Sequence, residues 1–340
     1  MRLNFLILFT ILMIVSCQCD RKNNKSTTSD KNNKESIIEQ KVSYLTHDGY
    51  TINGVITSPK SADNNNLPGI VLIHGSAPLD MDASWPAYLD SIPQTYNGKE
   101  VKNYKLIAEF LTENGFTVIR VNKRGVKKSL TDVDFEIYKT TSYTNILKDV
   151  NSEIETLNKE TNIDKFILLG WSEGTILSTK IAQERNDVIG LVLMGVVGSS
   201  FKGLMQHFFE NEEEFQEVIK LIENMPDYEM LGIDRPVIRV KELFQDEPNA
   251  ERIGKLQLPI LILHGNIDVE TPVSEAYLVK EAIEKNNNSK SKVIIYKGFG
   301  HGFVPHLGNN GEIKTIGPFD KKVINDITNW LNKNFADLKN

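Results

Sequence analysis

From about residue 40 to the C-terminus, short apolar runs of strand length alternate with longer stretches whose apolar positions recur at helical spacing. The predicted strands are residues 42–46, 51–58, 69–74, 116–121, 166–169, 189–197, 259–263 and 292–296. The predicted helices are residues 104–114, 143–158, 175–183, 274–284 and 320–335. This alternation predicts a mostly parallel sheet with helices on both faces. Antiparallel pairing is expected only at the start, where Asp48-Gly49 forms a turn between the first two strands.

One long stretch breaks the alternation. Between the strand that ends near Val197 and the strand that begins at Pro259, residues 203–209, 212–224 and 235–244 have amphipathic helical patterns. A helical excursion between two core strands predicts a cap, at about residues 200–257, over the C-terminal edge of the sheet. Open α/β sheets bind their ligands at that edge. The alternative interpretation is a peripheral helical insert with no role in ligand binding.

The N-terminal segment has the pattern of a targeting signal. Residues 3–15 are almost entirely apolar and follow a single Arg2, but they are too short to cross ~30 Å of hydrocarbon as a helix. The following Ile14-Val15-Ser16-Cys17 resembles the bacterial lipobox, in which the cysteine is lipidated and becomes the mature N-terminus. An exported, membrane-anchored lipoprotein is therefore expected; a simple signal peptide or a short anchor is the alternative. The predicted divisions are a signal peptide over 1–16, a flexible polar tether over 17–36 and a folded body over 37–340.

Composition and charge exclude several functions. The chain is 40% hydrophobic and 25% charged, as in ordinary folded proteins, and its net charge is −6. No strong positive field is present, so no nucleic-acid partner is expected. Both cysteines, Cys17 and Cys19, lie near the N-terminus. The folded body therefore has no disulfide, no cysteine-based zinc site and no thiol nucleophile.

The central motif is Gly170-Trp171-Ser172-Glu173-Gly174, which follows an apolar strand and opens a helix. Strand, tight turn and helix are the context in which a G-x-S-x-G motif presents a serine nucleophile. The glycines allow the close approach of strand and helix, and the helix N-terminus adds a positive partial charge. The alternative is a tight turn whose serine only caps the helix.

A serine nucleophile needs a base, and the base needs an orienting acid. Asp268 lies in the loop after the strand that ends near Leu263, and His301 lies in a glycine-flanked loop after the last strand. Both loops leave the C-terminal edge of the sheet, as Ser172 does. The order serine, acid, histidine is the one expected for this strand–turn–helix motif. His306 is a rival base, although Pro305 and its distance from the strand argue against it.

The oxyanion that forms during acyl transfer needs two backbone N–H donors. Glu173 follows the nucleophile and is expected to supply one of them. Ser76, in the loop after the third strand, is expected to supply the other, because Gly75 permits a sharp turn there. We expect His74 to hold this loop by hydrogen bonding and to take no part in proton transfer.

These motifs resemble the α/β-hydrolase superfamily of serine hydrolases, from about residue 42 to the C-terminus. Within it the chain is similar to bacterial esterases and serine-aminopeptidase-like enzymes near the dienelactone-hydrolase and acylaminoacyl-peptidase group. His74-Gly75-Ser76 and the segment 120–125 resemble that group's His-Gly-Ser-Gly-Pro-x-Asp loop and its Arg-Tyr-Asp-Lys-Arg-Gly turn. The departures are Ala77, Met81 and Asn122, which stand where glycine, arginine and aspartate are usual. Arg124 is expected to anchor its loop, with recognition of a substrate carboxylate as the alternative.

The resemblance implies a serine hydrolase that cleaves carboxylic esters through an acyl-enzyme, without a metal or a cofactor. A small ester or a short peptide is the expected substrate, and the N-terminal lipid is the expected link to a membrane. A peptidase, a thioesterase or acyltransferase, and an inactive surface-binding protein are the alternatives. A peptidase would need an anion in the pocket for the substrate amine, for which the cap acids Glu212 and Asp227 are candidates.

Overall fold

The structure of the protein is a computed structural model that describes residues 36–60, 67–85, 99–305, 317–335 and 338. The expected signal peptide, Cys17 and most of the tether lie outside the described residues, as does His306. Within the described part of the chain, none of the helices has the length and apolar character that a membrane-spanning helix needs.

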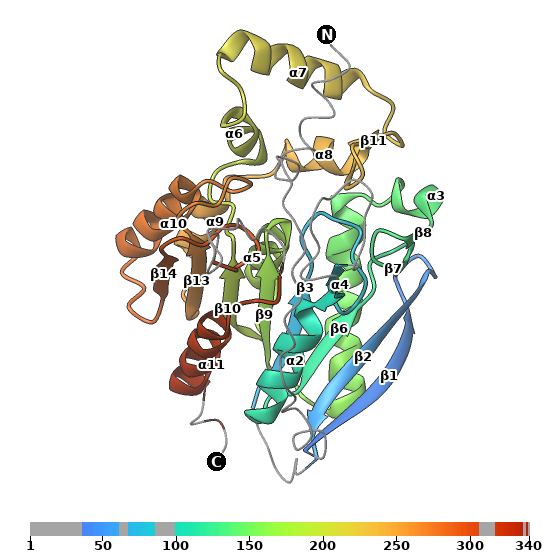
Figure 1. Ribbon diagram of the computed structural model, residues 1–340, viewed down its shortest axis with the longest axis vertical. Coiled ribbons are helices and arrows are strands. Elements are labelled where there is room, and N and C mark those ends of the chain that lie inside the picture. Colours follow the sequence, from blue (N-terminus) through green and yellow to red (C-terminus); the bar gives the residue numbers. More distant parts are fainter. Residues whose placement is uncertain (1–35, 61–66, 86–98, 306–316, 336–337, 339–340) are drawn as a thin grey trace, which may run out of the picture.

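One sheet of eight strands forms the centre of the molecule, in the order β1-β2-β6-β3-β9-β10-β13-β14 (Figure 1). Only the pairs β1–β2 and β2–β6 are antiparallel; the other neighbours are parallel, as the alternation of elements predicts. The strands are β1 Ile37–Leu45, β2 Thr51–Pro59, β3 Gly69–Ile73, β6 Val118–Val121, β9 Phe166–Trp171, β10 Val188–Met194, β13 Ile260–Gly265 and β14 Lys292–Tyr296.

The prediction that antiparallel pairing occurs only at the start of the chain is wrong. Three further two-stranded ribbons are antiparallel, and each lies in a connection between larger elements. Their strands are mostly two residues long, too short for an alternating pattern to show in the sequence. They are β4 Ser84–Trp85 with β5 Val101–Lys102, β7 Val126–Lys128 with β8 Asp132–Val133, and β11 Met230–Leu231 with β12 Arg235–Pro236.

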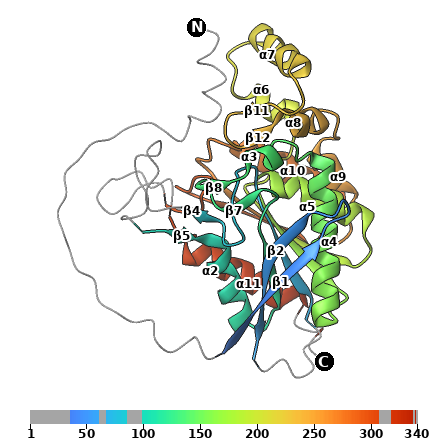
Figure 2. The same cartoon turned by 90° about the vertical axis from the view of Figure 1, so that its right-hand side faces the viewer.

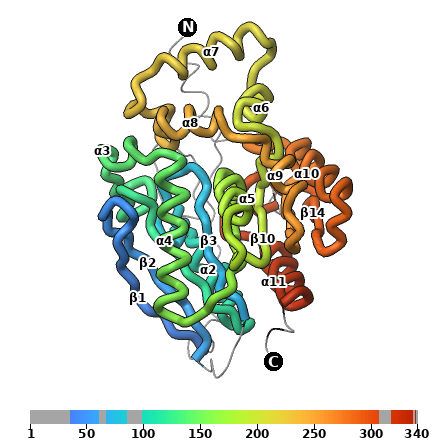
Figure 3. Tube along the Cα trace, turned by 180° about the vertical axis from the view of Figure 1, so that it is seen from behind, coloured from blue at the N-terminus to red at the C-terminus, as the bar shows by residue number. Residues whose placement is uncertain are grey.

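Helices cover both faces of the sheet (Figure 3). Helices α2 Asn103–Glu113 and α11 Lys321–Phe335 pack on one face, where their apolar sides belong to one buried cluster. The other face is covered by α4 Tyr143–Thr161, α5 Glu173–Glu184, α9 Asn249–Lys255 and α10 Val273–Lys285, whose apolar sides belong to a second cluster. A one-turn helix, α3 Phe135–Tyr138, precedes α4.

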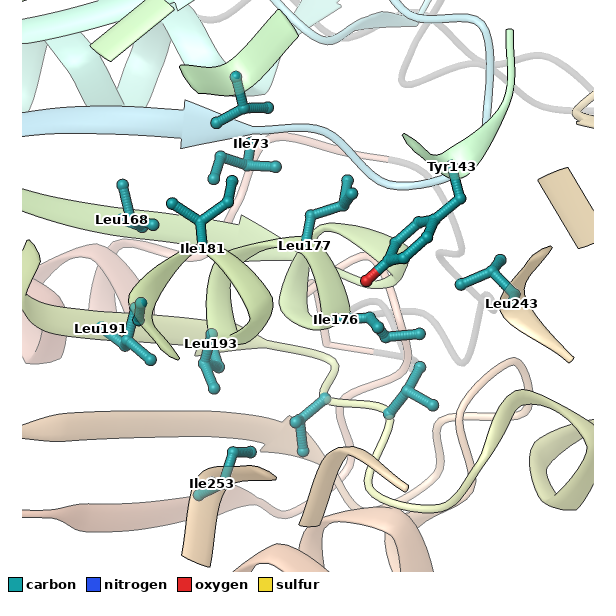
Figure 4. Close-up of a cluster of buried hydrophobic side chains, with 14 of the residues drawn as sticks. Ile73, Tyr143, Leu168, Ile176, Leu177, Ile181, Leu191, Leu193, Leu243 and Ile253 are labelled. Carbon is teal, nitrogen blue, oxygen red and sulfur yellow. The ribbon is translucent and has the colours of Figure 1, made fainter. Parts of the chain in front are cut away.

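The second cluster fixes α5 against the sheet. Figure 4 shows Ile176, Leu177 and Ile181 of α5 packed over strand residues such as Leu168 and Leu193. All of these side chains are at least 96% buried. Burial of one such side chain stabilises the fold by roughly 1.5–3 kcal/mol. The N-terminus of α5, which begins directly after Ser172, is therefore held at a fixed place on the sheet.

Between β10 and β13 the chain leaves the sheet through α6 Phe201–Gln206, α7 Glu212–Asn224, α8 Val237–Leu243 and α9. We call residues 200–257 the cap; most of it lies beyond the C-terminal ends of the parallel strands (Figures 1 and 2). The start of this excursion meets the first turn of α9. The Ala250 N–H donates to the Gly198 carbonyl at 2.6 Å, and the Asn249 N–H donates to the Ser199 carbonyl at 3.4 Å.

Candidate active site

Ser172 occupies a strained turn between β9 and α5. Its φ of 57° and ψ of −121° lie in a region that residues with a Cβ atom rarely adopt. The side chain makes no capping hydrogen bond to the helix, so helix capping does not account for a serine here. A Cβ atom at Gly170 would collide with the Gly174 carbonyl, and one at Gly174 would collide with the Ile73 carbonyl. The glycines therefore allow strand and helix to approach closely enough to form the turn.

Asp268 and His301 meet although they are far apart in the sequence. His301 Nδ1 lies 2.7 Å from Asp268 Oδ2, and the loops that carry them follow β13 and β14. The backbone N–H groups of Glu270 and Thr271 each donate to Asp268 Oδ1 at 2.9 Å, and the Thr271 hydroxyl donates to Oδ2 at 2.9 Å. Burial alone would raise the pKa of Asp268, but the neighbouring His301 lowers it, so the carboxylate is ionised.

Ser172 and His301 line one pocket. Because Nδ1 of His301 is turned to Asp268, the other ring nitrogen, Nε2, is available to the pocket. Among the described residues no hydrogen bond joins Ser172 Oγ to Nε2, and such contacts often tighten only when substrate binds. The described residues that line the pocket are Gly75, Ser76, Ala77, Leu79, Trp85, Asn103, Trp171, Ser172, Glu270, His301, Gly302 and Gly317.

The charge on His301 depends on two carboxylates. Burial lowers the pKa of His301, but Asp268 and Glu270 outweigh it and raise the pKa to about 9. Glu270 Oε2 lies 3.7 Å from His301 Nε2. Glu270 is not among the predicted site residues; its position two residues after the expected acid is the one signal in the sequence. The two carboxylates therefore favour the protonated form of His301 in the unliganded protein.

Lys123 orients the loop that carries Ser76. Its Nζ donates to the carbonyl oxygens of Gly75 at 2.6 Å, Ser76 at 2.8 Å and Ala77 at 3.1 Å. A trans peptide holds its C=O and the next N–H in opposite directions. The Gly75 carbonyl points at Lys123, so the Ser76 N–H points away from Lys123. The first N–H groups of a helix lack intrahelical acceptors, which leaves the Glu173 N–H available in the same way.

Lys123 is a residue that the sequence analysis missed, although it lies within the recognised segment 120–125. Burial and the nearby Arg239 lower its pKa, whereas three carbonyl acceptors suit the three donors of its ammonium form. Tyr138 assists, because its hydroxyl donates to the Ser76 carbonyl at 2.6 Å.

The cap contacts the same loop. The Ser76 hydroxyl donates to Asp234 Oδ2 at 3.0 Å and accepts from Arg235 Nη2 at 3.0 Å. Both residues belong to the β11–β12 ribbon of the cap or to its turn. Arg239 of α8, which is fully buried, lies 3.5 Å from the Glu173 carboxylate. The position of the cap is thus linked to both residues expected to donate to the oxyanion.

Other candidate residues have structural contacts. His74 Nε2 bonds the Val121 carbonyl at 2.9 Å, and burial lowers its pKa to about 4. Arg124 pairs with Asp48 and Asp149, which fits the expected loop anchor, and it is not among the residues that line the pocket of Ser172.

The remaining candidates are Asn122 and the cap acids Glu212 and Asp227. Asn122 accepts from the Met81 N–H at 2.8 Å, so this departure from the resembled motif still ties the two loops together. The cap acids Glu212 and Asp227 bond to other cap residues, Gln206, Gln216 and Lys241, and do not line the pocket.

In the described ranges, no group of three or more histidine, cysteine, aspartate or glutamate side chains is arranged to hold a metal ion. The pocket combines a serine at a helix N-terminus with a histidine that is bonded to a buried carboxylate. This set of groups is suited to nucleophilic acyl transfer.

Comparisons with known proteins identify a family and related proteins. The model of the prolyl oligopeptidase family, Peptidase_S9, matches residues 102–327. Esterase EstD of Thermotoga maritima is 24% identical over 301 residues, which are 83% of this chain and 66% of the relative. The uncharacterized peptidase YtmA of Bacillus subtilis is 22% identical over 188 residues, 54% of this chain and 62% of the relative. The chain thus spans slightly less than two thirds of the length of each curated relative.

A solved structure shows the same fold. The acylaminoacyl peptidase of Pyrococcus horikoshii aligns with a TM-score of 0.53 and 14% sequence identity, over 85% of this chain and 44% of that chain. With the order of the strands, this likeness confirms the α/β-hydrolase fold that the resemblance implied.

Proposed function

The chain belongs to the prolyl oligopeptidase family of serine hydrolases, and on that premise we propose that it cleaves carboxylic esters through Ser172, His301 and Asp268. One observation carries the proposal. Ser172, His301 and Ser76 line a single pocket, and Asp268 Oδ2 bonds Nδ1 of the histidine at 2.7 Å. The likeness to esterase EstD supports an ester as the substrate.

The proposed reaction has two halves. Ser172 Oγ attacks the ester carbonyl carbon while His301 Nε2 takes its proton, and Asp268 stabilises the resulting imidazolium. The N–H groups of Ser76 and Glu173 donate to the oxyanion of the tetrahedral intermediate. The intermediate collapses when His301 passes the proton to the departing alcohol, which leaves an acyl group on Ser172. Water then attacks this acyl-enzyme by the same proton transfers and releases the acid.

The test uses the detergent-solubilised full-length protein. It should hydrolyse short p-nitrophenyl esters, and a fluorophosphonate probe should label Ser172. Ser172→Ala should lose both the labelling and the turnover, because only binding effects remain without the nucleophile. A wild-type protein that neither turns over esters nor reacts with the probe would contradict the proposal and favour an inactive binding protein.

Peptide hydrolysis is the second candidate function. The family name and the likeness to peptidase YtmA support it, as does the presence of a carboxylate, Glu270, in the pocket. An aminoacyl p-nitroanilide and the p-nitrophenyl ester of the same acyl group separate the two functions. For an esterase, the ratio of kcat/KM for the ester over that for the anilide should far exceed the ratio of their uncatalysed hydrolysis rates. A peptidase should cleave both substrates.

We also propose that Cys17 carries a lipid that anchors the protein to the outer face of a bacterial membrane. The apolar run over residues 3–15 and the following Ile14-Val15-Ser16-Cys17 support this proposal. Cys17→Ser should release the protein from the membrane fraction. Retention of the variant in that fraction would contradict lipidation.

A further inference from the structure

We propose that Glu270 selects substrates whose alcohol group carries a positive charge. This inference rests on the proposed esterase function and adds a class of substrate to it. Glu270 is the only acidic residue among the described residues that line the pocket, and none of those residues is a lysine or an arginine. A cation that enters the pocket therefore meets one carboxylate in its lining, and the one group there that can oppose it is His301 when protonated.

The backbone of Glu270 is fixed, while its side chain is partly open to solvent. Its N–H donates to Asp268 Oδ1 at 2.9 Å, so the residue is tied to the proposed triad acid. Its side chain is 40% exposed, which leaves the carboxylate accessible to a ligand. Partial burial raises the pKa of Glu270, while His301 opposes that rise, so an assay at mildly alkaline pH keeps the carboxylate ionised.

The position of Glu270 indicates which part of the substrate it would contact. Its Oε2 lies 3.7 Å from Nε2 of His301, the atom that hands a proton to the departing alcohol in the proposed reaction. A positive group on the alcohol would therefore lie beside Glu270. Trp85 and Trp171 are among the residues that line the same pocket, and aromatic residues attract quaternary ammonium groups.

The other charged groups near Glu270 do not cancel its effect on the pocket. Arg235 and Asp234 both act on it electrostatically, but their charges oppose each other. The two also form an ion pair at 2.9 Å. His301 is the remaining cation, and it must lose its proton before Ser172 can react. At that point the carboxylate of Glu270 has no charged partner in the pocket lining, and a substrate cation can take that place.

The experiment compares two esters of equal shape. Butyrylcholine carries a quaternary nitrogen, and 3,3-dimethylbutyl butanoate has carbon at that position. Acid release is followed by pH-stat titration at about pH 8, where the Glu270 carboxylate is ionised and about a tenth of His301 is neutral. The protonated fraction lowers kcat/KM for both esters by the same factor, so it cancels in their ratio. In Glu270→Gln the ratio of kcat/KM for the cation over that for its neutral partner should fall about fivefold relative to wild type, as expected for one partly exposed charge pair.

Two variants control the comparison. Glu212→Gln makes the same chemical change on the outside of the cap and should leave the ratio unchanged. Glu270→Asp keeps the charge and should retain part of the preference, which a purely structural role for Glu270 would not require. A wild-type ratio equal to that of Glu270→Gln overturns the inference while ester hydrolysis itself stands.

A second readout covers the case in which neither ester is a good substrate. Tetramethylammonium chloride should slow fluorophosphonate labelling of the wild-type protein more than sodium chloride at equal ionic strength, and Glu270→Gln should abolish the difference. Equal labelling rates in the two salts for wild type overturn the inference. Absence of any labelling or turnover instead overturns the proposed function, and the inference falls with it.

Discussion

On the acidic side of its pH profile, this enzyme should lose activity at an unusually high pH. His301 has to be neutral to accept the proton of Ser172, and Asp268 and Glu270 raise its pKa to about 9 against the effect of burial. Arg235 and His264 also act on the pair formed by His301 and Asp268, and Arg235 lowers the pKa of His301. A base two pH units below its pKa is about 1% neutral, so kcat/KM at pH 7 should be about one hundredth of its alkaline plateau.

The measurement is the pH profile of kcat/KM for a neutral ester between about pH 6 and pH 10, because this parameter reports the pKa values of the free enzyme. Product is followed at the isosbestic wavelength of nitrophenol, and Ser172→Ala provides the rate of spontaneous hydrolysis. The acidic limb should rise tenfold per pH unit. In Glu270→Gln the limb should move to lower pH, since one of the two carboxylates that favour the imidazolium has been removed.

A profile that is already flat at pH 7 would refute this reasoning. It would mean that His301 is neutral in the unliganded protein and that Glu270 does not act on Nε2. An unchanged limb in Glu270→Gln, with the wild-type limb near pH 9, would assign the whole effect to Asp268.

Three further outcomes follow from contacts of the described residues. Lys123→Met should lower kcat by about 10- to 100-fold with little change in KM, because the Ser76 N–H is no longer aimed at the oxyanion, and an unchanged kcat in steady-state kinetics would contradict that role. Ser172→Gly should be about 1 kcal/mol more stable than Ser172→Ala and should therefore unfold at a higher temperature, because only glycine relieves the strain of a φ of 57°. Equal melting temperatures of these two inactive variants would argue against strain at the turn. Arg124→Met should cost about 3 kcal/mol in urea denaturation, since it leaves Asp149 buried without its partner, and a loss below about 1 kcal/mol would show that the ion pairs are dispensable.

Much of the fold could be predicted from the sequence because its strands are continuous apolar runs. β9 and β10 are almost fully buried, so their composition alone separates them from amphipathic helices such as α4 and α11. The helix α9 was not predicted. It has only seven residues, Arg252 within it is buried through ion pairs, and its pattern therefore does not look apolar.

The central residues of the candidate site could also be selected, because strand ends and chain order restrict where a nucleophile, an acid and a base can meet. Lys123 and Glu270 could not be selected in this way. Lys123 acts through three backbone carbonyls, and such contacts leave no mark in a pattern of side chains. Glu270 is one acidic residue among many until the structure brings it beside Nε2 of His301.

The contact between Gly198, just before the cap, and Ala250, in the first turn of α9, has a consequence for how this protein can be altered. A segment that departs and returns at the same point can be exchanged for another without changing the path of the flanking strands. The fold could thus have acquired new specificity by insertion of foreign sequence at this one junction, and a protein engineer could graft a different lid there. Any such replacement would also have to supply a substitute for Asp234 and Arg235, because the loop it covers depends on them.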